Sequence, residues 1–173
     1  MTENTTEQNT LGDSAQLAFS MQKVYVKDLS FEAPGVPEVF NFEGGYKPNV
    51  NLELNTSNRL VNGDSYEVSL NITVTAKEEE NVMFLAEVKQ CGVFLLQNMD
   101  EATKRHTLGS FCPSILFPYA RQVISEMISN GGFPQLLLAH INFEQLFKAQ
   151  EERRASEADG AAPAVASPTE SSH

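Results

Sequence analysis

Residues 66–75 read YEVSLNITVT, and apolar and polar side chains alternate through this stretch without a break. A period of two is typical of a β-strand that buries one face and exposes the other. The turn signal Asn62-Gly63-Asp64 precedes the stretch, and the charged turn Glu78-Glu79-Glu80-Asn81 follows it. The pattern therefore predicts a strand between two short turns, which favours an antiparallel sheet.

Three further stretches, 19–32, 50–55 and 82–96, alternate in a similar way. In the first, one parity holds large apolar side chains but is interrupted by two lysines: Phe19, Met21, Lys23, Tyr25, Lys27, Leu29 and Phe31. In the last, Phe84, Ala86 and Val88 share one face, and Leu85, Glu87 and Lys89 share the other. Together the four stretches predict a four-stranded antiparallel sheet.

The apolar period changes after the fourth strand. Apolar side chains recur at spacings of three and four, which predicts an amphipathic helix over 113–130: Leu116, Ala120, Val123, Ile124, Met127 and Ile128. Pro113 or Pro118 suits its first turn, and Gly131-Gly132 ends it. A second, short helix follows Asn142, a good N-cap residue. Helices that follow a sheet indicate the α+β class.

Composition divides the chain into three parts. Residues 1–17 are polar and acidic, and residues 154–173 are rich in Ala, Ser, Pro, Glu and Gly, so both are predicted to be disordered tails. Residues 18–153 are predicted to form one domain. The N-terminus has no basic and apolar segments of a signal peptide, and no apolar run approaches the roughly 20 residues of a membrane span. We expect a cytoplasmic protein.

Charge and motifs narrow the function. The formal charge of −11 disfavours nucleic acid and anionic membranes as partners, and it favours basic partners or simply solubility. Cys91 and Cys112 lack metal-ligand spacing, and the three histidines lie far apart in the sequence. No phosphate-binding or hydrolase motif is present. We expect no enzyme, no cofactor and no metal, although distant residues of an α+β enzyme with an apolar pocket can still meet in the fold.

Several connections carry more apolar side chains than a solvated loop needs. Aromatic residues lie in or beside them at Phe40, Phe42, Tyr46, Phe133 and Phe143, and the loop 133–141 is largely apolar. They either cap the edges of the core or line a groove that accepts apolar side chains of a partner. Taken singly, each fits the core; as a group, they favour the groove.

Longer runs resemble the SecB family of bacterial protein-export chaperones. The similar runs cover about residues 19–150 and occur in order: 25–34, 66–68, 84–88, 112–121, 132–136 and 141–143. The resemblance implies a homotetramer, arranged as a dimer of dimers, that binds unfolded precursor proteins and delivers them to the SecA motor ATPase. It also implies no cofactor and no catalysis. The apolar faces of the 113–130 helix and of the fourth strand, which exceed what one small sheet can cover, favour the same assembly.

The resemblance also assigns sites. The SecA-docking residues fall on Asp28, Glu32, Leu85 and Glu87, and all four residue types match. The expected client-binding groove, which combines the family's pattern with the apolar connections, holds Tyr46, Phe84, Ala86, Val88, Gln90, Phe133 and Leu138. Cys91 and His140 depart from the family's usual Gly and Pro. The alternative within the same fold is a SecB-like chaperone dedicated to an antitoxin, which often lacks the docking acids.

Overall fold

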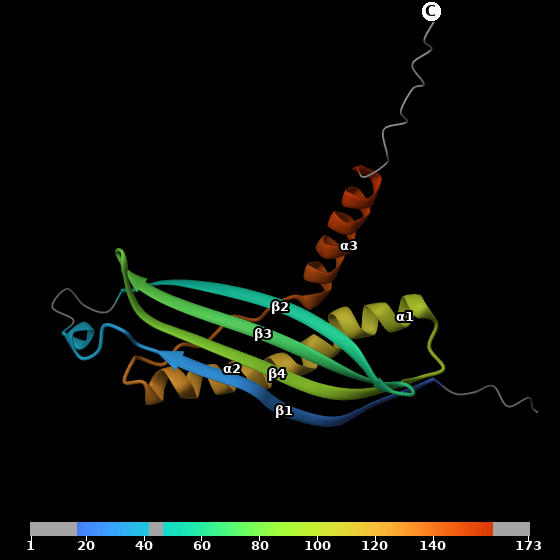
Figure 1. Ribbon diagram of the computed structural model, residues 1–173, viewed down its shortest axis with the longest axis horizontal. Coiled ribbons are helices and arrows are strands. Elements are labelled where there is room, and N and C mark those ends of the chain that lie inside the picture. Colours follow the sequence, from blue (N-terminus) through green and yellow to red (C-terminus); the bar gives the residue numbers. More distant parts are fainter. Residues whose placement is uncertain (1–16, 42–46, 161–173) are drawn as a thin grey trace, which may run out of the picture.

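The computed structural model describes residues 17–41 and 47–160, with side chains described as far as residue 157. Its four strands are β1 (Ala18–Glu32), β2 (Asn49–Asn62), β3 (Ser65–Glu78) and β4 (Asn81–Gln97). They form one antiparallel sheet in the order β1-β4-β3-β2. Two helical segments follow, and the first runs across one face of the sheet while the second projects away from it (Figure 1). The predicted α+β fold is confirmed.

The core lies between the sheet and the long helical segment. We call the side of the sheet that packs against α2 (Cys112–Asn130) the helix face and the other side the open face. Strands β3 and β4 present buried side chains to α2, among them Leu70, Ile72, Phe84 and Phe94, and α2 contributes Leu116, Ala120, Ile124 and Ile128. The predicted apolar faces therefore meet each other. No helix in the described ranges is long and apolar enough to cross a membrane.

The long helical segment begins earlier than its apolar period predicts. It starts with α1 (Glu101–His106), passes through a π-helical turn η2 (Thr107–Phe111) and continues as α2. Asp100 caps the start by accepting a hydrogen bond of 2.9 Å from the Thr103 amide. Pro113 follows the π-helical turn, where its missing N–H removes no partner from a regular turn, and Pro118 lies inside α2 rather than in a first turn.

The last helix, α3 (Phe143–Gly160), is also longer than predicted. Asn142 is its cap and accepts a 3.0 Å hydrogen bond from the Gln145 amide, as expected. The helix continues to Gly160, so the predicted start of the tail at residue 154 is too early in the sequence. Good helix formers and the Glu151–Arg154 ion pair at 3.3 Å extend it. Residues 1–16 and 161–173 lie outside the described residues.

Two bulges in β1 explain the lysines that interrupt its alternation. The pairing with β4 shifts between Met21 and Lys23 and again between Val26 and Asp28. Each extra residue reverses the parity. The helix face therefore receives first Phe19 and Met21, then Val24 and Val26, then Leu29 and Phe31. Tyr25, which a single alternation groups with these apolar residues, lies on the open face opposite Cys91.

Candidate functional site

The open face brings the four predicted docking residues together. Strands β1 and β4 are neighbours, and Glu32 pairs with Leu85 while Ser30 pairs with Glu87 and Asp28 with Lys89. Asp28, Glu32 and Glu87 are exposed and Leu85 is half-buried. We call Asp28, Glu32, Leu85 and Glu87 the acidic face. Its geometry confirms that the two pairs lie side by side, and their role in docking stays a prediction.

Local hydrogen bonds involve two of the three carboxylates of the acidic face. Glu87 accepts from Thr73 Oγ1 at 3.1 Å and from Ser30 Oγ at 3.4 Å, one from each neighbouring strand. Asp28 accepts a 3.0 Å bond from the Leu29 amide. These contacts leave lone pairs of the carboxylates free for a cationic partner. Three carboxylates on the same face as one apolar side chain suit a basic segment that also carries an apolar residue.

The open face also holds a buried carboxylate, Glu67, which sequence reasoning missed. Its side chain is 3% exposed, although it lies on the side of the sheet away from α2. Lys27 Nζ lies 2.8 Å from Glu67 Oε1, the Tyr25 hydroxyl donates to the same oxygen, and Arg59 Nε donates to Oε2. One carboxylate thus joins β1, β3 and β2. The only sequence sign was Lys27, which breaks the alternation of β1.

These partners shift two pKa values. Hydrogen bonds from Lys27 and Tyr25, and then from Arg59, lower the pKa of Glu67 from its ordinary 4.5 to about 2, against the opposing effect of burial. Burial, and then the hydrogen bond to Glu67, raise the pKa of Tyr25 to about 12. Glu67 therefore stays ionised at any physiological pH, and Tyr25 stays a hydrogen-bond donor to it.

The shift of Glu67 predicts how stability changes with pH. A lowered folded-state pKa stabilises the fold above the ordinary value of 4.5, and that contribution is lost as the pH falls toward about 2. At neutral pH we expect Glu67→Gln to lower the free energy of unfolding by about 1.5–3 kcal/mol, the usual contribution of hydrogen bonds to a charged group. Denaturant unfolding should show the difference from wild type shrinking below about pH 4.5. A constant difference down to about pH 2.5 would contradict this account.

The predicted client groove lies mostly in the core of the chain. Phe84, Ala86, Val88 and Gln90 belong to the helix face and are at most 2% exposed. Phe133 and Leu138 are also buried, at 4% and 7% exposed. The prediction that these side chains line an open surface is therefore wrong for this conformation, because α2 and the loop after it cover them. Tyr46 lies outside the described residues.

An aromatic cluster occupies the place of that groove. The Phe133 ring centre lies 4.9 Å from that of Phe84, 5.2 Å from that of Phe40 and 6.3 Å from that of Phe31. Phe40, at 37% exposed, remains open to solvent at this cluster, and Leu137, at 66% exposed, remains open to solvent on the loop that follows Phe133. Beside Leu137, a hollow of about 450 Å³ opens between α2 and the loop. Part of the exposed apolar surface thus lies on the connections, as their composition predicted, but of the residues predicted for the client groove none that the structure describes belongs to it.

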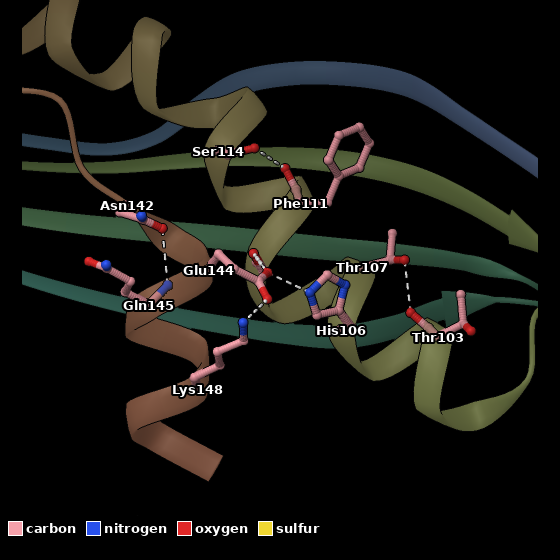
Figure 2. Close-up of polar contacts among 10 residues, drawn as sticks. Thr103, His106, Thr107, Phe111, Ser114, Asn142, Glu144, Gln145 and Lys148 are labelled. Atoms are coloured by element: carbon pink, nitrogen blue, oxygen red, sulfur yellow. Dashed lines mark hydrogen bonds and ion pairs between the residues drawn. The ribbon is translucent and has the colours of Figure 1, made fainter. Parts of the chain in front are cut away.

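A second polar cluster fastens α3 to α1 (Figure 2). Glu144 pairs with His106, accepts a 3.0 Å hydrogen bond from Ser110 and lies 3.2 Å from Lys148 Nζ. His106, and then Ser110 and Lys148, lower the pKa of Glu144. Ser110 and His106 both contact Glu144 rather than each other, which is not the order of a nucleophile and its base. Among the described residues, no group of His, Cys, Asp and Glu could hold a metal.

Comparison with known proteins identifies the family. A family model described as Preprotein translocase subunit SecB matches residues 12–154. The Protein-export protein SecB of Ectopseudomonas mendocina is 47% identical over 94% of this chain and 99% of its own length. Those of Pseudomonas fluorescens strain SBW25 and Nitrosococcus oceani are 50% and 46% identical, over 87% and 90% of this chain and 93% and 95% of their own lengths.

A solved structure shares the fold at much lower identity. The SecB-like chaperone of Mycobacterium tuberculosis, in complex with a peptide from an antitoxin, aligns with a TM-score of 0.58 at 12% identity. The alignment covers 71% of this chain and 87% of that one. The likeness supports the fold, and the sequence matches, which cover nearly the whole chain, also show the family. The chain belongs to the SecB family of protein-export chaperones.

Proposed function

We propose that this chain works in the cytoplasm as a homotetramer, holds unfolded preproteins and delivers them to the SecA motor ATPase, without catalysing a reaction itself. The observation that carries the proposal is the acidic face. Asp28 and Glu32 on β1 lie beside Leu85 and Glu87 on β4, with the carboxylates exposed. These four positions match the family's docking residues in type and, in the fold, form one surface.

The mechanism of docking follows from the chemistry of the acidic face. Exposed ion pairs each contribute about 0.2–1 kcal/mol, so three carboxylates give moderate affinity, to which Leu85 adds apolar contact. Screening acts strongly on exposed charges. Docking of a basic SecA segment should therefore weaken as the salt concentration rises.

Client binding uses weak contacts repeated many times. An unfolded polypeptide offers apolar side chains, and each large one that becomes buried contributes about 1.5–3 kcal/mol before entropic costs. Phe40, which contacts Phe133 of the aromatic cluster, and Leu137, which lines the hollow beside α2, are exposed on connections and suit such contacts. A tetramer presents several copies of this surface to one long chain, which raises avidity. Unfolded rather than folded protein is then the preferred client.

Dedication to an antitoxin is the alternative function for this fold. The likeness to the mycobacterial chaperone does not distinguish the two functions, because at 12% identity it concerns the fold alone. The presence of Asp28, Glu32, Leu85 and Glu87 favours motor docking.

Glu87→Lys tests the proposal. Reversing one charge of the acidic face should weaken binding to the cognate SecA about tenfold, as expected when favourable ion-pair energies become repulsive. Retention of a reduced, unfolded client and the native mass should persist. Glu152→Lys, the same charge change at an exposed position on α3, is the matched control and should leave SecA binding unchanged. Loss of SecA binding, client retention and assembly together would show that Glu87 has a structural role only.

A further inference from the structure

The second bulge of β1 decides which of its side chains reach the open face. Pairing with β4 shifts between Val26 and Asp28, so Lys27 is the extra residue. Side chains alternate along a strand, and a slip of one residue moves every following side chain to the other face. If Lys27 instead took a regular place in the ladder opposite Lys89, Asp28 would pair with Val88, and Asp28 and Glu32 would lie on the side of the sheet that carries α2.

Glu67 binds this bulge from the open face. It lies on β3, on the far side of β4 from β1, and its buried carboxylate still reaches the β1 side chains. Lys27 Nζ lies 2.8 Å from Oε1, and the Tyr25 hydroxyl donates to the same oxygen. Glu67 therefore holds the extra residue of the bulge and the residue two positions before it.

Gln90 binds the same bulge from the helix face. Its side chain is buried, and its Nε2 donates a 2.9 Å hydrogen bond to the backbone carbonyl of Tyr25. In the register of the sheet, Gln90 pairs with Val26, immediately before the extra residue. A bulge disrupts the ladder locally, and this side-chain donor adds a hydrogen bond between β4 and β1 next to the disruption. The bulge is thus fastened on both sides of the sheet.

We propose that Glu67 is a positioning residue for motor docking: through Lys27 it holds the bulge that sets Asp28 and Glu32 beside Leu85 and Glu87. The inference rests on the proposed docking function of the acidic face. β1 is an edge strand with one neighbour, so its register depends on fewer hydrogen bonds than that of a central strand. Glu67 itself is 2% exposed and acts through β1 rather than by touching the partner.

The test compares Lys27→Met, Arg59→Met and Glu67→Gln in the full-length protein, with binding to the cognate SecA measured for each. Lys27 and Arg59 both bond to Glu67 and both have substantially exposed side chains, but only Lys27 belongs to the bulge. Charge alone predicts that either Met variant binds a basic partner more tightly, because a cation is removed near an acidic surface. If Glu67 acts through Lys27 to position the bulge, Lys27→Met should instead bind SecA more weakly.

We expect Lys27→Met and Glu67→Gln each to weaken SecA binding about three- to tenfold, within the range of coupling between contacting residues, although they change the net charge in opposite directions. Arg59→Met should bind at least as tightly as wild type. The double variant Lys27→Met with Glu67→Gln should bind no more weakly than either single variant. Undiminished binding by Lys27→Met, or additive losses in the double variant, would overturn the inference.

Amide hydrogen exchange over residues 28–32 measures how firmly this part of β1 is held in the sheet, in the absence of SecA. Exchange should be faster in Lys27→Met and Glu67→Gln than in wild type or Arg59→Met, because the edge strand is less firmly held. Wild-type protein that fails to bind SecA would refute the proposed function, and hydrogen exchange would then decide the positioning role alone. Unchanged exchange in both variants would overturn it. If Glu67→Gln fails to fold, Lys27→Met provides the same comparison.

Discussion

Phe133→Ala is expected to lower the free energy of unfolding by about 3–5 kcal/mol, the usual effect of truncating a buried phenylalanine. The ring is 4% exposed and packs against Phe84 and Phe40 with ring centres 4.9 and 5.2 Å apart. Its removal leaves a cavity at the end of the core and releases the loop after α2. Denaturant unfolding followed by circular dichroism measures the change.

Leu137→Ala, four residues further along the same loop, is the matched control. The Leu137 side chain is 66% exposed, so stability should change by less than about 0.5 kcal/mol. If Leu137 belongs to the client surface, this variant stays folded and releases an unfolded client more readily. A Phe133→Ala protein of wild-type stability that had lost client retention would contradict the core assignment and restore Phe133 to an open groove.

The regular elements could be predicted from sequence because their apolar period is unbroken. β3 alternates from Tyr66 to Thr75, and its two turns are marked by glycine and charge. The start of the long helical segment could not be predicted in this way. Thr107, Gly109 and Ser110 interrupt the apolar period, although the chain remains helical through the π-helical turn. α3 extends past residue 153 because local charge pairs stabilise residues with little apolar character.

The candidate site was partly predictable for a related reason. Period two placed Asp28 with Glu32 and Leu85 with Glu87, and only the strand order was needed to join the pairs. Burial on the open face could not be predicted, because Glu67 reads as a solvated residue until Lys27 and Arg59 are seen to cover it. The predicted exposure of Phe84 on the helix face was wrong for a similar reason. α2 covers Phe84, and period alone does not show how far a helix extends over a sheet.

An uncovered apolar seam predicts assembly of the chain. β1 extends beyond the cover of α2, and its helix-face side chains Phe19 and Met21 remain 36% and 41% exposed. Phe111, at 50% exposed, contacts Phe19 with ring centres 5.2 Å apart and continues the seam onto the helix. Further exposed apolar side chains extend it along β1 and α2: Val26, Leu29 and Tyr119. A second copy of the chain, meeting the seam through a symmetric contact, would cover it.

Phe111→Glu should therefore break the assembly. Light scattering of wild-type protein at micromolar concentration is expected to give about four times the chain mass of 19.1 kDa, and the variant a smaller particle. Each phenylalanine buried at such a contact contributes about 1.5–3 kcal/mol, and symmetry repeats the loss when a charge replaces it. Leu60→Glu, at a 55% exposed position on the opposite edge strand, is the control and should keep the wild-type mass.

Circular dichroism should show both variants folded, because neither side chain lies in the core. A wild-type mass near 19.1 kDa would refute the tetramer, and an unchanged mass for Phe111→Glu would show that the contact lies on another surface.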